Sequence, residues 1–219
     1  MRRESLFDLP AATAADLAPA NRREFAGPPA FNVQLTQPII SLLAASGAVS
    51  VLDLGCGNGW FSAVLGRCGF DVTGADASEQ RLQLARARHP DLSFVRHDVM
   101  DPWDGQQRRF DAVVAIDFVD HLVKPRRLFD AALAALAPGG LLVVTAPYHD
   151  YLKNLAIALS GRFDLRWQAL ESDGRLKFFS SATLMALMAE PGLVDLRLQR
   201  VGRIPALARS MIASGRAPG

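Results

Sequence analysis

The feature that most restricts how this chain can fold is the segment VLDLGCGNGW, in which Gly55, Gly57 and Gly59 follow a short apolar run. The run Ser50–Leu54 has the length of a buried strand, and the residues from Trp60 onward have the pattern of a helix. Glycines at alternate positions let the backbone turn sharply and let a ligand lie against main-chain atoms at the start of the helix. The segment therefore predicts a strand–loop–helix unit that binds a small ligand.

Strand-like and helix-like segments alternate along most of the remaining sequence. Strands are expected at residues 50–54, 70–75, 92–97, 111–116, 141–146, 193–201 and 210–214. Helices are expected at residues 33–46, 60–68, 78–89, 125–136, 152–159 and 180–188, with Ser78 as the N-cap of the third. This alternation predicts an α/β protein with a Rossmann-like, doubly wound, mostly parallel seven-stranded sheet and helices on both faces.

The length of 219 residues suits one sizeable core and is short for two full domains. We expect a single domain over residues 33–219, preceded by an N-terminal arm or lid over residues 1–32 that is rich in Ala, Pro and Arg. No internal repeat interrupts this pattern.

Composition excludes several classes of protein. The net charge is +2 and the basic pairs are separated by acidic or apolar residues, so nucleic acid is not an expected partner. Two cysteines, Cys56 and Cys68, indicate neither a disulfide framework nor a zinc cluster. The first residues lack the apolar run of a signal peptide, and no run is long enough to span a bilayer. We expect a cytoplasmic protein without membrane attachment, and either a monomer or a homodimer.

An acidic residue lies at or directly after the end of each of the first three predicted strands, at the edge where open α/β sheets bind ligands. Asp53 is placed to hold the loop and to face an ammonium group. Asp76 could accept both hydroxyls of a ribose, and Asp98 could accept a hydrogen bond from an exocyclic amine. Taken singly, Asp76 and Asp98 are equally explained as ordinary loop acids. Their serial placement favours a bound nucleoside.

A nicotinamide or flavin cofactor is the main competing ligand for such a loop. Its fingerprint needs Gly or Ala at the sixth position, where this chain has the bulky Trp60, and no lysine is placed for a phosphate-binding loop. The pattern therefore favours a cationic, zwitterionic ligand over a pyrophosphate.

Together these motifs resemble those of class I S-adenosylmethionine-dependent methyltransferases over roughly residues 33–215, in the style of small-molecule enzymes such as the ubiquinone-biosynthesis O-methyltransferases. The similar segments are VLDLGCGNG, GADAS, HDV, FDAVVAIDFVDHLVKP and LAPGGLLVVTAP. The resemblance implies cofactor contacts from Asp53, Gly55, Cys56, Gly57, Asp76, Ala77, Asp98, Val99 and Asp117. It also implies that residues 148–179 form a small cap, inserted after the fifth strand, that covers the acceptor.

Methyl transfer requires an oriented acceptor and, for a hydroxyl or a protonated amine, a base. The candidate catalytic residues are His149, on the loop after the fifth strand, and His121 with Asp117 after the fourth. The plainer alternative is that Asp117 touches the cofactor rim, Asp120 caps a helix, His121 packs against it and His149 is an exposed loop residue.

A divalent metal is possible but not expected. If residues 117–121 begin a helical turn, then Asp117, Asp120 and His121 share a face and could bind a cation. Arg175 stands where related metal-binding sequences place a further histidine, so a fourth ligand is missing unless His149 substitutes.

The sequence thus predicts an enzyme that transfers a methyl group from S-adenosylmethionine to a small molecule, with O-methylation slightly favoured and S-adenosylhomocysteine as product. One alternative is a nucleic-acid methyltransferase. Residues 116–119 read IDFV in place of the Asn/Asp-Pro-Pro-Tyr signature of base-methylating enzymes. A second alternative is a protein that binds the cofactor without catalysis.

Overall fold

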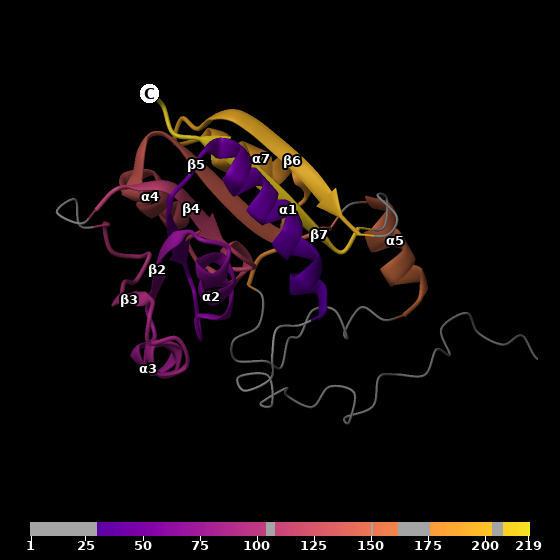
Figure 1. Ribbon diagram of the computed structural model, residues 1–219. Coiled ribbons are helices and arrows are strands. Elements are labelled where there is room, and N and C mark those ends of the chain that lie inside the picture. The colour runs from indigo at the N-terminus through magenta and orange to yellow at the C-terminus, as the bar shows by residue number, and fades with distance from the viewer. Residues whose placement is uncertain (1–29, 104–107, 150, 162–175, 203–207) are drawn as a thin grey trace, which may run out of the picture.

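The computed structural model describes residues 30–103, 108–149, 151–161, 176–202 and 208–219, which build a twisted seven-stranded sheet flanked by helices (Figure 1). The strand order is β3-β2-β1-β4-β5-β7-β6. Strands β1 to β5 run parallel, and β7 is antiparallel to both of its neighbours. The bounds are β1 Ser50–Leu54, β2 Asp71–Asp76, β3 Ser93–Arg96, β4 Phe110–Ala115, β5 Leu136–Pro147, β6 Val194–Val201 and β7 Ser210–Arg216. The expected fold class is confirmed.

The helices lie close to where the sequence predicts them. Their bounds are α1 Ala30–Ser46, α2 Trp60–Arg67, α3 Glu79–Arg88, α4 Arg126–Ala135, α5 Tyr151–Leu159 and α7 Ser181–Ala189, with a 3-10 turn η1 at Val119–His121. Ser78 caps α3 as expected, because its side chain accepts a hydrogen bond from Arg81 N. Helix α1 begins at Ala30, inside the segment predicted as an arm, and the remainder of that segment lies outside the described residues.

Side chains that alternate along the central strands enter two separate cores, one on each face of the sheet. Val51 packs with residues of α1 and α2, namely Leu35, Ile39, Leu43, Phe61 and Leu65. Leu52, its neighbour, packs with residues of α4 and α7, namely Leu128, Phe129, Leu184 and Met188. In Figure 1, α1 lies in front of β5 and β7. The helices on both faces leave the carboxyl ends of the strands as the edge where loops can bind a ligand.

Most strand boundaries differ from the prediction by one or two residues, and two of the differences affect the argument. β5 begins at Leu136, earlier than expected, and its pairing with β4 is irregular because Phe110 faces Leu136 whereas Ala112 faces Leu141. Gly139 accommodates this irregularity with a φ of 71°, which favours glycine. β3 ends at Arg96, so Asp98 lies in the following loop and does not end the strand itself.

The segment expected as a cap is described in part. α5 follows β5 directly, and the chain is described again from Leu176, whose backbone N–H donates to Asp120 O at 2.8 Å, while Lys177 N donates to the same oxygen at 3.0 Å. Residues 162–175, among them Arg175, lie outside the described residues. None of the described helices is both long and apolar enough to cross a membrane.

At the amino-terminal ends of the central strands, away from the glycine loop, Asp111 of β4 joins β4 to the start of β1. Its Oδ2 accepts hydrogen bonds from Ser50 N at 2.8 Å, Ser50 Oγ at 2.8 Å and Val49 N at 3.1 Å. The Ser50 N–H, with further help from the Ser50 hydroxyl and Val49 N–H, lowers the pKa of Asp111.

We predict that Asp111→Ala lowers the free energy of unfolding at pH 7 by about 1 kcal/mol, a value reduced for the exposure of this carboxylate. Because the folded pKa is depressed, this stabilisation is present above the unfolded pKa and is lost as pH falls through the folded one. Urea unfolding at pH 7 and pH 3 tests this prediction. The control is Asp130→Ala, which removes an exposed carboxylate on α4. An equal loss at both pH values would contradict the prediction.

Candidate functional site

The glycine loop between β1 and α2 is attached to the end of β2 by its own main chain. Gly55 N and Cys56 N both donate to Ala75 O, at 2.7 and 3.0 Å. Gly57 has a φ of 56°, and a Cβ added to it would meet no atom within 4 Å. A Cβ on Gly55 would lie 2.5 Å from the ring of Phe118. The backbone of Gly57 is therefore where a ligand can approach the loop, whereas Gly55 makes room for an aromatic side chain.

Asp76 connects this loop to α3. Its Oδ2 accepts a hydrogen bond from Gly57 N at 2.9 Å and its Oδ1 accepts one from Ser78 N at 2.8 Å. The side chain is buried. Because each oxygen of a carboxylate can accept two hydrogen bonds, an acceptor position remains on each beyond these two. Asp76 can thus organise the loop and still bind a pair of hydroxyls.

Asp53 lies at the end of β1 and is 2% exposed. Its Oδ2 accepts a hydrogen bond from Ser62 Oγ of α2 at 2.6 Å. Burial, with a smaller contribution from the nearby negative charge of Asp76, raises the pKa of Asp53 to about 6. Two carboxylates this close together favour a cationic ligand, because a positive charge would relieve their mutual repulsion.

Cys56 takes part in the loop through its backbone N–H, and its side chain packs in the protein interior. Burial is the main cause that raises the pKa of its thiol. The side chain packs in a small core with Leu82, Ala85 and Phe94. A thiol this difficult to ionise is a poor nucleophile, which agrees with the expected role of Cys56 as part of the loop.

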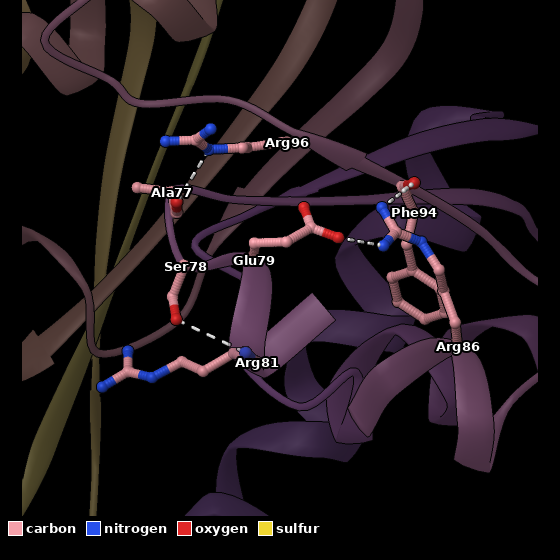
Figure 2. Close-up of polar contacts among 7 residues, drawn as sticks. All are labelled: Ala77, Ser78, Glu79, Arg81, Arg86, Phe94 and Arg96. Atoms are coloured by element: carbon pink, nitrogen blue, oxygen red, sulfur yellow. Dashed lines mark hydrogen bonds and ion pairs between the residues drawn. The ribbon is translucent and has the colours of Figure 1, made fainter. Parts of the chain in front are cut away.

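Figure 2 shows polar contacts around Ala77 and Ser78, the two residues that follow Asp76 in the sequence. Arg96 Nε donates to Ala77 O at 3.3 Å. Arg86 links α3 to β3, since its guanidinium donates to Glu79 Oε1 at 2.6 Å and to Phe94 O at 3.2 Å. Ala77 itself is exposed, as a residue flanking a bound nucleoside would need to be. Sequence reasoning missed both arginines, because nothing in their spacing indicates which carbonyl groups they reach.

The third predicted contact region, after β3, has one exposed residue, Asp98, and one buried residue, Val99. Asp98 is exposed, and its Oδ1 accepts a hydrogen bond from Met100 N at 2.9 Å. The side chain of Val99 is 3% exposed and belongs to the larger core, so a contact from Val99 to a ligand would come from its main chain. The adenine contacts of Asp98 and Val99 stay predictions.

The helical turn that the metal alternative requires at residues 117–121 does not begin at Asp117. Asp117 has a left-handed backbone with a φ of 47°, and the turn begins only at Val119. Asp117 N donates to Thr145 Oγ1 at 2.8 Å, and this hydroxyl donates back to Asp117 Oδ1 at 3.1 Å. The condition under which Asp117, Asp120 and His121 would share a helical face is therefore not met.

The two other polar residues of this segment have different environments. Asp120 is 1% exposed, and the side chain of His121 is 39% exposed, with 4.0 Å between His121 Nε2 and Asp120 Oδ2. Across the described parts of the chain, no group of three His, Cys, Asp or Glu residues is arranged to hold a metal ion.

His149 begins the connection from β5 to α5 and is partly buried. Its Nδ1 lies 3.4 Å from Asn154 Oδ1, and its ring meets that of Phe178 edge-on, with 5.1 Å between centroids. Phe178 follows Leu176 and Lys177, which bond to Asp120 O. Three parts of the chain that are distant in the sequence thus meet beyond the carboxyl ends of β4 and β5: Asp120, His149 with Asn154, and residues 176–178.

The sequence profile of the methyltransferase-domain family matches residues 3–198, so this chain belongs to that family. It is 28% identical over 147 residues to the ubiquinone biosynthesis O-methyltransferase of Roseobacter denitrificans, with 65% of this chain and 59% of the relative covered. It is 31% identical over 148 residues to the enzyme of the same name from Cereibacter sphaeroides, with the same coverage. The chain therefore spans about three fifths of the length of these relatives, and the resemblance seen in the motifs is confirmed.

Solved structures support the fold. The magnesium protoporphyrin IX methyltransferase of Synechocystis PCC 6803, with bound SAH, matches with a TM-score of 0.64 at 18% identity, covering 90% of this chain and 92% of that one. The [4+2]-cyclase SpnF matches with a TM-score of 0.65 at 19% identity, covering 84% and 81%.

We predict that Asp53→Asn stabilises the protein above pH 6 by about 1–3 kcal/mol. The folded pKa of Asp53 lies above its unfolded value, so its stabilising contribution is fully present below about pH 4 and is lost as pH rises through about 6. The difference in unfolding free energy between variant and wild type should therefore grow between pH 4 and 7, as measured by urea unfolding. Asp98→Asn, at an exposed position, is the control. A difference independent of pH would contradict the prediction.

Proposed function

We propose that this chain catalyses S-adenosylmethionine-dependent methyl transfer to a small-molecule acceptor, with an acceptor hydroxyl favoured. The observation that carries the proposal is the carboxylate of Asp76, which hydrogen-bonds Gly57 N where the glycine loop is open to a ligand. Membership of the methyltransferase-domain family and the names of the curated relatives support it.

The residues of the site fit this cofactor by shape and charge. The methionine portion of the cofactor would lie against the backbone of Gly55, Cys56 and Gly57. The buried carboxylate of Asp53 suits the ammonium group of this portion. Asp76 suits the ribose hydroxyls, while Ala77, Asp98 and Val99 flank the adenine. Asp117, held by Thr145, lies at the rim. The bound cofactor supplies a methyl group on a positively charged sulfur that leaves as a neutral thioether.

The chain itself has to orient the acceptor and remove a proton. As the acceptor oxygen bonds to the methyl carbon and the carbon–sulfur bond breaks, the hydroxyl proton passes to a base. His149 is the favoured base, because it is partly buried and packs against Phe178 where the distant segments meet. His121, more exposed and 4.0 Å from Asp120 Oδ2, is the second candidate.

The exposed side chains of α5, the helix that follows His149, favour an apolar acceptor. Tyr151 and Leu159 of α5 are 74% and 75% exposed, and Leu155 and Leu176 are also exposed. Lys153, the only charged residue in α5, is buried. Among the described residues of α5, no charged side chain therefore faces solvent, which suits a phenolic or similar small molecule better than a phosphate backbone.

Two alternative functions, cofactor binding without catalysis and methylation of nucleic acid, are distinguished by the experiments below. The likeness to a [4+2]-cyclase is a reason to include cofactor binding without methyl transfer, since one fold can host different chemistries. A nucleic-acid methyltransferase would bind RNA or DNA with an affinity that falls steeply with salt.

We predict that S-adenosylmethionine and S-adenosylhomocysteine bind the full chain at micromolar strength and that Asp76→Ala weakens both by at least about 10-fold. Isothermal titration calorimetry measures this. Asp71→Ala is a matched control, because Asp71 lies on the same strand at its opposite end. If the wild-type chain binds neither ligand, the cofactor assignment is wrong.

We further predict that a panel of phenols, catechols and hydroxylated quinols yields an acceptor for which S-adenosylhomocysteine is released. His149→Gln should lower that turnover by about 10²-fold or more, with little change in cofactor affinity, because a base contributes mainly to the chemical step. Mass spectrometry of the products measures both rate and site. Cofactor binding with no turnover of any phenol, amine or nucleic acid would favour the non-catalytic alternative.

A further inference from the structure

Lys153 is a buried lysine, with 8% of its surface exposed, in the first turn of α5. Its Nζ donates hydrogen bonds to Tyr148 O at 2.6 Å, Ala208 O at 3.0 Å and Arg209 O at 3.5 Å. Burying an ammonium group is costly unless it is hydrogen-bonded, and Lys has three N–H donors for these main-chain oxygens. Lys153 thereby joins α5 to the end of β5 and to the residues that lead into β7.

These contacts hold the backbone immediately before His149. Tyr148 N donates to Arg209 O at 3.1 Å, so Tyr148 is held through both its N–H and its carbonyl group. The Tyr148 ring is 1% exposed, and the guanidinium of Arg200 lies 5.2 Å from its centroid. His149 therefore leaves the sheet from a fixed point.

Asn154, the residue after Lys153, contacts the His149 ring. The 3.4 Å from Asn154 Oδ1 to His149 Nδ1 suits an Nδ1–H donor and an amide acceptor. An imidazole that carries its proton on Nδ1 has its lone pair on Nε2. Because an amide does not ionise, Asn154 can select this tautomer without adding the negative charge that would favour the imidazolium form.

We propose that Lys153 and Asn154 are positioning residues for His149: Lys153 fixes the backbone from which the imidazole projects, and Asn154 fixes the tautomer whose proton-accepting lone pair lies on Nε2, an atom that is buried in this structure. This inference rests on the proposed function, in which His149 is the base. The acceptor hydroxyl proton passes to Nε2, and the imidazolium formed keeps its Nδ1–H bond to Asn154.

Nitrogen-15 NMR of the histidine rings in the full chain tests the tautomer without any acceptor. The sequence has four histidines, so the His149→Gln variant assigns the His149 signals. Wild type should show mainly the Nδ1–H tautomer at pH 8. Asn154→Ala should shift the population toward Nε2–H, while Asn154→Asp should retain Nδ1–H and move the titration midpoint of His149 to higher pH. Gln83→Ala, at an exposed α3 position, is the control.

Lys153 is tested by the same signals. Lys153→Met should reduce the Nδ1–H population and broaden the His149 resonances, whereas Lys124→Met, at an exposed lysine, should leave both unchanged. If Lys153→Met does not fold, Lys153→Arg, which keeps the charge with a different reach, provides the comparison. Unchanged His149 tautomer populations in Asn154→Ala would overturn the role of Asn154, and unchanged His149 signals in a folded Lys153 variant would overturn that of Lys153.

A kinetic readout separates positioning from general stability. With an acceptor from the panel, Asn154→Ala should lower kcat about 10-fold and leave the KM for S-adenosylmethionine unchanged. A chain that shows the tautomer preference but binds no S-adenosylmethionine would retain the positioning role and lose the proposed function, so the two failures are distinguishable.

Discussion

The carboxylate of Asp76 is the interaction on which the candidate cofactor site depends. One side chain accepts the N–H of Gly57 and the N–H of Ser78, so a single negative charge connects the glycine loop to the start of α3. The loop can reach this carboxylate because β1 and β2 pair in parallel register, with Leu54 opposite Ala75. Ala75 O in turn binds the N–H groups of Gly55 and Cys56. The sheet therefore sets the loop geometry before any ligand is present, which is the preorganisation that tight binding requires.

The same region shows a conflict between stability and binding. Asp53 is buried close to Asp76, and its raised pKa reports that the ionised form is disfavoured there. A chain selected only for stability would have replaced this carboxylate by a neutral group. Its retention beside the hydroxyl of Ser62 is explained if a positively charged ligand completes the site. The burial of Asp53 close to a second carboxylate thus adds a charge argument for a cation to the pattern of the motif.

The cofactor end of the site could be predicted from the sequence because its parts are local. Gly55 and Gly57, and then Asp76, follow buried strands directly, and the apolar run that defines a strand also defines where it ends. The two core faces were equally predictable, since Val51 and Leu52 alternate. Errors arose where tertiary contacts override local pattern. Asp117 adopts a left-handed backbone with Thr145 as partner, and Thr145 lies on a different strand. No helical spacing could have indicated that contact.

The region around His149, in contrast, is built from contacts between segments that are distant in the sequence. Phe178 reaches His149, and Leu176 reaches Asp120, only because the chain returns to the sheet after α5. Lys153 attaches α5 through main-chain oxygens, so the attachment does not depend on the side chains that α5 presents to solvent. Of the exposed α5 residues, Asn154 contacts His149, whereas Leu159, at the far end of the helix, can change without altering the attachment through Lys153. A buried cation bonded to backbone thus anchors the segment that carries His149 independently of the apolar side chains that α5 exposes.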